Sequence, residues 1–240
     1  MRHRLFLPLI GLLIVPLLLA ADLNRSGPLK QTTSGRFTVI YSPELESSVS
    51  PVASQMEYVM ADIEHFFGVP TSRPLRIEIL TFSDFTQTGM DPKRVRAFYN
   101  MQDTLVLNYG TTTARSSAST INETLLIHET VHAYVHLRDP MTFQKIPLWF
   151  HEGLAMYLMV RLSREAPPVH TAKVRVFSPL DSDPHNNGLQ AVRYLVERRG
   201  DPSLGKVLDL VGQGESFENA LRTVYDLASI AALQEELRRW

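Results

Sequence analysis

Four residues in the middle of the chain have the types and spacing of a metal-dependent hydrolytic site. Residues 128–132 read His-Glu-Thr-Val-His, and Glu152 follows after 19 intervening residues. A helix turns by about 100° per residue, so His128 and His132 lie one turn apart and their imidazoles can reach one ion. Glu129 lies beside that face, where it can take a proton from water. A catalytic zinc site uses three protein ligands, and Glu152 is the candidate for the third.

The residues around this HExxH motif have the pattern of a helix. Thr120 and Glu123 have the spacing of a capping box, which satisfies free amides at a helix start. Apolar residues frame the motif: Leu125, Leu126, Ile127, Val131, Ala133, Val135 and Leu137. We expect a helix over residues 121–137 that stops before Pro140, because proline disfavours helical geometry in the residue before it.

A second helix is expected after a short loop. Pro147 fits a first helical turn, and the apolar pattern continues to about Arg161. Trp149, Glu152 and Met156 fall on one stripe of this helix, so the glutamate can face the first helix. The expected site is therefore a zinc ion held across two neighbouring helices, with Glu129 as the hydrolytic base.

Together the two segments resemble a known family of enzymes. HETVH at 128–132 and WFHEGLAMY at 149–157 are similar to gluzincin metallopeptidases, in particular the bacterial peptidase MA-like group. That group follows HExxH with W-[FL]-x-E-G-[LFI]-A about twenty residues later. The resemblance implies an α+β, zincin-like metallopeptidase domain that binds one Zn²⁺ through His128, His132 and Glu152. It also implies hydrolysis of a peptide or protein substrate by activated water, with Glu129 as general base and acid.

Two positions depart from the family pattern. Some gluzincins place an aspartate one turn after the third ligand to orient a ligand histidine, and this chain has Met156 there. Relatives also often supply a downstream tyrosine or histidine for the oxyanion, the negatively charged oxygen that forms when the carbonyl is attacked. His185, in an irregular loop expected at 178–188, is the candidate for that role. A solvated turn without function is the alternative reading of this loop.

Two other histidines near the motif are not expected to bind the ion. His136 extends the motif to HExxHxxxH, but metzincins turn the chain at a glycine before their third histidine, and none lies between His132 and His136. On a helix His136 is about 6 Å further along the axis than His132, so we expect it to pack or hydrogen-bond beside the site. His151 points about 100° away from Glu152, and a surface or loop contact is expected for it.

The residues before the motif predict a small mixed sheet. Residues 37–41 and 75–80 alternate like strands. Between them, Ser50 and Pro51 open a helix that Gly68 ends. A strand, a helix and a strand in this order form a crossover unit, which would make the two strands parallel.

A hairpin is expected between this sheet and the motif. Residues 95–109 would form it, with 100–103 as the turn and 104–109 as the second arm. In zincin-like folds the strand before the catalytic helix lies at the sheet edge and pairs with extended peptide. The resemblance therefore implies that 104–109 bind substrate by strand addition, and an interior strand is the alternative. The Thr- and Ser-rich loop at 111–119 is expected to rim the cleft.

The rest of the chain predicts a helical C-terminal part and one domain. Helices are expected at 189–199, 202–210, 217–225 and 229–239, with glycines as stops. The polar segment 22–36 reads as a lead-in or linker, and residues 37–240 as a single metallopeptidase domain.

The first 21 residues have the composition of an export signal. Arg2 and Arg4 precede the mostly apolar residues 5–19, and Ala20-Ala21 offers a cleavage site. These fifteen residues are short for a membrane span of about twenty. We expect a cleaved signal and a periplasmic or secreted protein, with a retained membrane anchor as the alternative. The chain has no cysteine, so it forms no disulfide and carries no lipid on a cysteine.

Charge excludes some partners and leaves two rival classes. Without the two leader arginines, 22 of the 24 basic residues remain against 25 acidic ones. Such a chain is not expected to bind nucleic acid, and it meets a membrane only if the leader is retained. A catalytically inactive peptide-binding protein with the zincin fold is one rival, although the intact Glu129 argues against it, and a structural zinc domain is the other. Cleavage preference, exo- or endopeptidase action and oligomeric state stay open.

Overall fold

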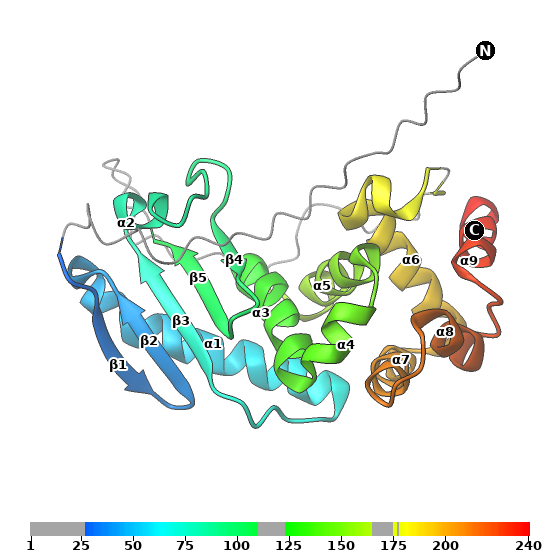
Figure 1. The fold of residues 1–240 in the computed structure, drawn as a ribbon, viewed down its shortest axis with the longest axis horizontal. Helices are drawn as coiled ribbons and strands as arrows, with labels where there is room; N and C mark the ends of the chain where they lie inside the picture. Colours follow the sequence, from blue (N-terminus) through cyan, green and yellow to red (C-terminus); the bar gives the residue numbers. More distant parts are fainter. Residues whose placement is uncertain (1–26, 110–122, 165–174, 177) are drawn as a thin grey trace, which may run out of the picture.

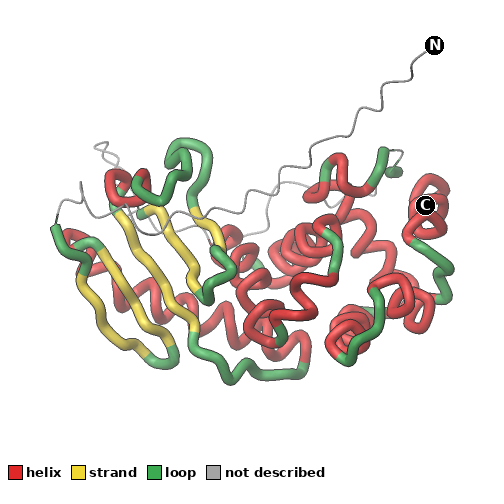
Figure 2. Tube along the Cα trace, viewed as in Figure 1, coloured by secondary structure: helices red, strands yellow, loops and turns green. Residues whose placement is uncertain are grey.

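The protein is α+β, with a small sheet formed by the N-terminal half and helices formed by the rest (Figure 1). The computed structural model describes residues 27–109, 123–164, 175–176 and 178–240. The expected leader and the expected cleft loop at 111–119 lie outside the described residues. Figure 2 shows the strands gathered on one side of the molecule and most of the helices on the other. Within the described ranges, no helix has both the length and the apolar character needed to cross a membrane.

Five strands form one mixed sheet, and four of them lie in the segments where the sequence predicts strands. They are β1 (Lys30–Ser34), β2 (Phe37–Tyr41), β3 (Leu75–Leu80), β4 (Ala97–Tyr99) and β5 (Thr104–Asn108). The order across the sheet is β1-β2-β3-β5-β4. The predicted crossover is confirmed, because β2 and β3 are parallel. The predicted hairpin is confirmed too, because β4 pairs antiparallel with β5.

One helix covers a face of this sheet. The 3-10 helix η2 (Pro43–Leu45) leads into α1 (Glu46–Phe67), which starts four residues before the predicted Ser50 and ends at Gly68. Met56, Met60 and Ile63 of α1 are fully buried in one core cluster with alternate residues of β2, β3 and β5. The opposite face carries a smaller cluster around Phe85 of the short helix α2 (Phe82–Thr86). This alternation explains why the period-two pattern in the sequence located the strands.

Part of the expected lead-in belongs to the sheet. Residues 30–34, read from the sequence as part of a polar tether, form β1 and pair with β2 along their whole length. The prediction of a lead-in through residue 36 is therefore wrong for this segment. An edge strand is stabilised by main-chain hydrogen bonds on one side, so its side chains can stay polar and give no apolar signal.

The predicted substrate-binding edge is also wrong. β5, the second arm of the hairpin, lies between β3 and β4, and the first arm β4 forms the edge. Every residue of β5 is buried, which suits an interior strand that pairs with β3 on one side and β4 on the other. The interior strand that the sequence left as an alternative is therefore the observed one.

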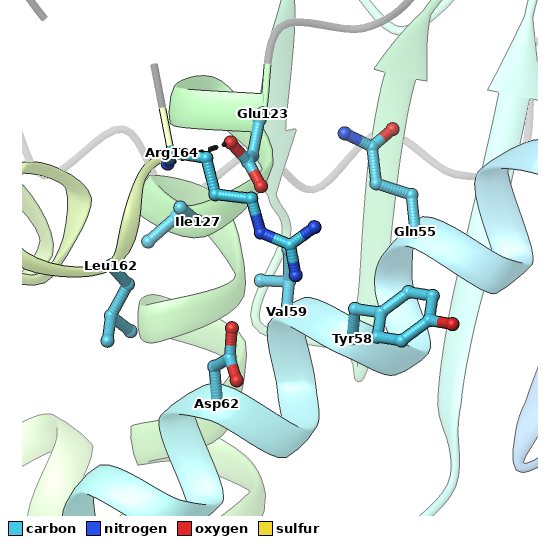
Figure 3. A pocket seen from close by; sticks show the side chains of 8 residues that line it. All are labelled: Gln55, Tyr58, Val59, Asp62, Glu123, Ile127, Leu162 and Arg164. Carbon is cyan, nitrogen blue, oxygen red and sulfur yellow. Dashed lines mark hydrogen bonds between the residues drawn. The ribbon is translucent and has the colours of Figure 1, made fainter. Parts of the chain in front are cut away.

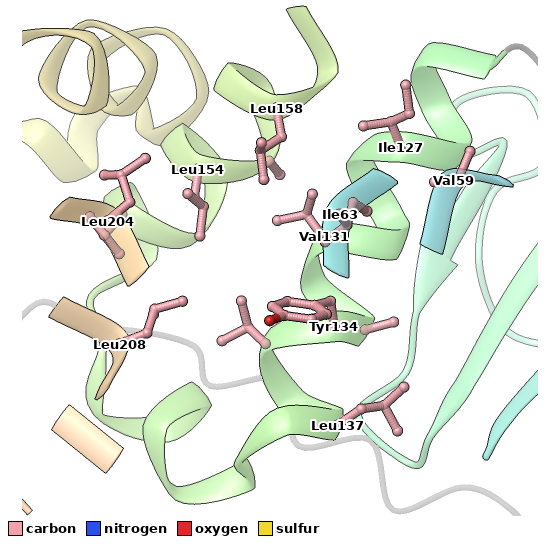
Figure 4. Packing of buried hydrophobic residues seen from close by; sticks show 14 of the residues in the cluster. Val59, Ile63, Ile127, Val131, Tyr134, Leu137, Leu154, Leu158, Leu204 and Leu208 are labelled. Carbon is pink, nitrogen blue, oxygen red and sulfur yellow. The ribbon is translucent and has the colours of Figure 1, made fainter. Parts of the chain in front are cut away.

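Seven helices follow the sheet among the described residues. They are α3 (Glu123–Arg138), α4 (Pro140–Lys145), α5 (Leu148–Leu162), α6 (Pro184–Arg199), α7 (Pro202–Gly212), α8 (Phe217–Tyr225) and α9 (Ile230–Arg239), with the 3-10 helix η3 (Leu180–Ser182) before α6. α3 lies between the sheet edge and α5 (Figure 1). Leu154 and Leu158 of α5 pack toward Val131 of α3 on one side and toward α7 on the other (Figure 4). The C-terminal helices lie close to the predicted bounds, except that α6 begins five residues early.

Candidate metal centre

Helix α3 carries the HExxH motif at the centre of the fold. Its described part begins at Glu123 and ends at Arg138, just before Pro140, as the sequence predicts. Ile127 and Val131 are buried on its core side. The side chains of His128 and His132 are only 11% and 12% exposed, so their ring nitrogens need partners within the protein or a bound ion.

Three side chains from α3 and α5 meet at one point. The Nε2 atoms of His128 and His132 are 3.2 Å apart. Glu152 Oε2 lies 3.2 Å from His128 Nε2 and 3.6 Å from His132 Nε2. A tetrahedral zinc ion with bonds of about 2.1 Å holds its ligand atoms about 3.4 Å apart. These are the only such group among the described residues, and they could hold one metal ion.

The polar atoms in this group are better placed to bind an ion than to hydrogen-bond with one another. Glu152 Oε2 is buried and makes no hydrogen bond of acceptable geometry, although the Nε2 atoms of three imidazoles, those of His128, His132 and His185, lie within 3.6 Å of it. Burial alone would raise the pKa of Glu152, but His128 and His132 lower this pKa well below its ordinary value. A buried carboxylate oxygen that faces imidazole nitrogens without a well-formed hydrogen bond is suited to a divalent cation with histidine and carboxylate ligands.

Glu129 lies next to the group with one carboxylate oxygen already held. Its Oε2 accepts a hydrogen bond from the Tyr99 main-chain amide of β4 at 3.2 Å. Burial raises the pKa of Glu129 above its ordinary value, although His128 and His132 oppose that change. A carboxylate with a raised pKa is a stronger base than an exposed one.

Helix α5 positions Glu152 through a close crossing with α6. Trp149 and Phe150 are buried, which turns Glu152 toward α3. Gly153 and Gly188 meet where the two helices cross, and a Cβ on Gly153 would lie 2.3 Å from the Gly188 carbonyl oxygen. Only glycine at both positions allows this approach, and the approach brings the first turn of α6 to the metal group.

His185 reaches the site from that first turn. Its Nε2 lies 3.0 Å from Glu152 Oε2, and its ring stacks on His128 with 5.7 Å between centroids. The prediction of an irregular loop at 178–188 is wrong for its last part. Asp183 accepts a hydrogen bond from the Asn186 amide and so caps α6, with Pro184 in the first turn. His185 is half exposed and is not part of the three-residue group, so it lies at its rim.

Two histidines near the motif lie outside the group of three converging side chains. His136 Nδ1 is 2.7 Å from the Tyr99 hydroxyl and 3.1 Å from Asp103 Oδ1, which agrees with the expected hydrogen-bonding role. His151 is buried, so the expectation of a surface contact is wrong. Its Nε2–H donates to the Phe143 carbonyl in α4, and burial lowers its pKa to about 4.

Sequence reasoning missed the amide of Tyr99 and the carboxylate of Asp103. The hairpin that holds both was predicted, but no local pattern indicated that its outer arm would lie against α3. Only the register of the sheet brings β4 to Glu129.

A cavity in the described part lies away from the metal group. It has a volume of about 280 Å³ and lies between α1, the first turns of α3 and the end of α5 (Figure 3). Asp62 and Glu123 face Arg164 across it, and the Arg164 amide donates to Glu123. It contains no member of the metal group, so the candidate centre is identified by converging side chains and not by cavity size.

Comparison with known proteins adds no family to these observations. No family model matches the chain, and no curated protein matches it significantly. The resemblance to gluzincin peptidases therefore rests on HETVH and WFHEGLA alone. The candidate centre rests on the positions of His128, His132, Glu152 and Glu129.

Proposed function

We propose that the protein is a zinc-dependent peptidase with a zincin-like fold. His128, His132 and Glu152 would hold one zinc ion, and Glu129 would act as general base and acid. The observation that carries the proposal is the convergence of these ligand atoms at tetrahedral spacing, with a carboxylate base beside them. When bound there, zinc supplies a Lewis acid that activates water and polarises a carbonyl.

Glu129 moves the proton in this proposal. The Tyr99 amide fixes one of its oxygens, and the other takes a proton from the attacking water. The same carboxyl group then returns the proton to the leaving amine.

His185 is the proposed oxyanion donor. Its half-exposed ring lies at the rim of the group, 3.0 Å from Glu152 Oε2, where a substrate carbonyl would enter. A protonated or neutral imidazole N–H there can donate to the oxygen that gains negative charge. The Gly153–Gly188 crossing supports this role, because it fixes the His185-bearing turn against α5.

The edge strand β4 supports peptide as the substrate class. The Arg96 carbonyl accepts from the Asn108 amide, and the Asn100 amide donates to the Thr104 carbonyl, so both residues direct main-chain groups toward β5. Alternate residues Ala97 and Tyr99 therefore direct theirs away from the sheet. The Tyr99 amide donates to Glu129. The Tyr99 carbonyl and the amide and carbonyl of Ala97 could then pair with an extended peptide. The proposed substrate edge is thus β4, next to the base.

Export is proposed with this activity. The basic start and apolar run of residues 1–21 support a signal for the periplasm or the medium. Sequencing the N-terminus of protein recovered from each cell fraction separates a cleaved signal from a retained anchor.

The experiment that tests the proposed function combines a diverse peptide library with a metal chelator. We expect cleavage by the zinc-loaded protein, loss of cleavage with chelator and recovery with added zinc. Glu129→Gln is the matched control, because it keeps the ligands and removes the base. We expect this variant to bind zinc without cleaving. A wild-type protein that binds peptide and zinc but cleaves nothing would instead support the inactive peptide-binding protein.

A further inference from the structure

A second polar cluster lies at the far end of α3, outside the metal group. The Tyr99 hydroxyl is 2.7 Å from His136 Nδ1 and 3.3 Å from Asp103 Oδ1. His136 Nδ1 is also 3.1 Å from the same Asp103 oxygen, so the three groups form a closed triangle. Arg73 neutralises the other Asp103 oxygen at 2.5 Å and reaches the His136 carbonyl at 3.4 Å.

The cluster holds a hairpin turn in an unfavourable conformation. Met101 and Asp103, both in the turn between β4 and β5, have φ of 56°. Few residues other than glycine adopt such values, and they persist where surrounding contacts hold them. Asp103 is held at both ends: its carboxylate joins the triangle, and its carbonyl accepts from the Arg76 amide at 2.8 Å. The turn is therefore tied to β3 and to α3 at once.

One residue connects this turn with the proposed base. Glu129 and His136 are seven residues apart on α3, which is two turns, so they share a face. Tyr99 contacts both, because its amide donates to Glu129 and its hydroxyl meets His136. Burial raises the pKa of Tyr99 strongly and Asp103 raises it further, so the hydroxyl stays protonated and available as a donor.

We propose that Asp103 and His136 are positioning residues for Glu129 and act through Tyr99. They hold the hydroxyl of Tyr99 in place. This fixes the position of β4 along α3, so that the Tyr99 amide meets the Glu129 carboxylate. The same contact fixes the outward groups of β4 relative to the ligand histidines. The catalytic consequence rests on the proposed function, whereas the contact itself does not.

The test removes one atom from the clamp. Tyr99→Phe keeps the ring and the main-chain amide and deletes the hydroxyl. Tyr157→Phe is the matched control, because its half-buried hydroxyl also donates to an aspartate, Asp201, at 2.6 Å. His136→Ala breaks the clamp from the other side, and His136→Asn restores a polar atom near the Nδ1 position. The readouts are hydrogen exchange at the amide of residue 99, zinc affinity, and kcat and KM on a cleaved peptide.

We expect Tyr99→Phe and His136→Ala to accelerate exchange at residue 99 and to lower kcat by about tenfold, with zinc affinity within about threefold of wild type. His136→Asn should recover most of both losses, and Tyr157→Phe should show neither. Unchanged exchange at residue 99 in both clamp variants overturns the positioning role, as does a kcat loss no larger than that of Tyr157→Phe. If the wild type cleaves nothing while exchange still accelerates in the variants, the contact is supported and only the proposed hydrolase fails.

Discussion

Helix α3 places histidines in two opposite situations. Near its C-terminal end, His136 has a tyrosine hydroxyl and an aspartate within hydrogen-bond distance. In its middle, His128 and His132 direct Nε2 atoms at each other and at a buried Glu152 oxygen that makes no well-formed hydrogen bond. The first arrangement is complete with protein groups alone. The second could hold a cation. The proposal therefore assigns His128 and His132 as ligands and His136, one helical turn further along, as a positioning histidine.

Substitution of one histidine from each end tests the difference most strongly. We expect His132→Ala to lower zinc affinity by more than about a hundredfold, because it removes a ligand, whereas His136→Ala removes only an outer contact. Competition with a chromophoric chelator measures both. Equal losses in the two variants would mean that His136 belongs to the metal site and would break the comparison.

His151 offers a third situation, a buried histidine with one partner. Its pKa falls to about 4 because of burial, while the unfolded chain has the ordinary value near 6.5. The unfolded state therefore binds more protons between these values, so stability is lost as pH falls below about 6.5 and continues to fall toward pH 4. The free energy of unfolding should fall in both proteins as the pH is lowered across that window. We expect the fall to be smaller in His151→Gln than in the wild type, by on the order of 2 kcal/mol.

Urea titrations of both proteins without metal, at pH 7 and at pH 4.5, measure this difference. Parallel losses in the two proteins would show that the imidazole of His151 is not the group that titrates.

The glycine crossing that brings His185 to Glu152 has an expected effect of similar size. A Cβ on Gly188 would lie 2.1 Å from the Trp149 carbonyl oxygen, so Gly188→Ala must separate α5 from α6. We expect a destabilisation of about 1–3 kcal/mol from overpacking, and a loss of cleavage larger than the loss of zinc affinity. Gly205→Ala on helix α7 is the control, because its Cβ would meet only Phe67 of α1, at an ordinary contact distance of 3.7 Å. Chemical unfolding measures the stability of both variants. Equal stability of Gly188→Ala and Gly205→Ala would rule out the close crossing.

Local pattern was sufficient for the helices and strands that build the centre. The HExxH helix, the WFHEGLA helix and the parallel crossover all follow from spacing of apolar residues, caps and prolines within about twenty residues. His128, His132 and Glu152 could therefore be placed on facing helices before any coordinates. That their ligand atoms meet at tetrahedral spacing is the structural result that agrees with the expected ligand set.

Long-range pairing decided what the sequence left out or misplaced. β1 has no apolar signal, and β5 became an interior strand because β4 took the outer position. The contact of Tyr99 with Glu129 depends on the register of that outer strand. His185 reached the site because a capped helix start and a pair of glycines 35 residues apart position α6, and neither glycine alone indicates a crossing.

X-ray absorption at the zinc edge tests the central claim most directly. For the purified, zinc-loaded protein we expect one zinc per chain, with two imidazoles, one carboxylate oxygen and a further light atom at about 2.0–2.2 Å. Glu152→Gln should change the oxygen shell and leave the imidazole signature. A protein that retains no zinc after dialysis, or a spectrum without the two imidazoles, would contradict the assignment of His128, His132 and Glu152 as the metal ligands.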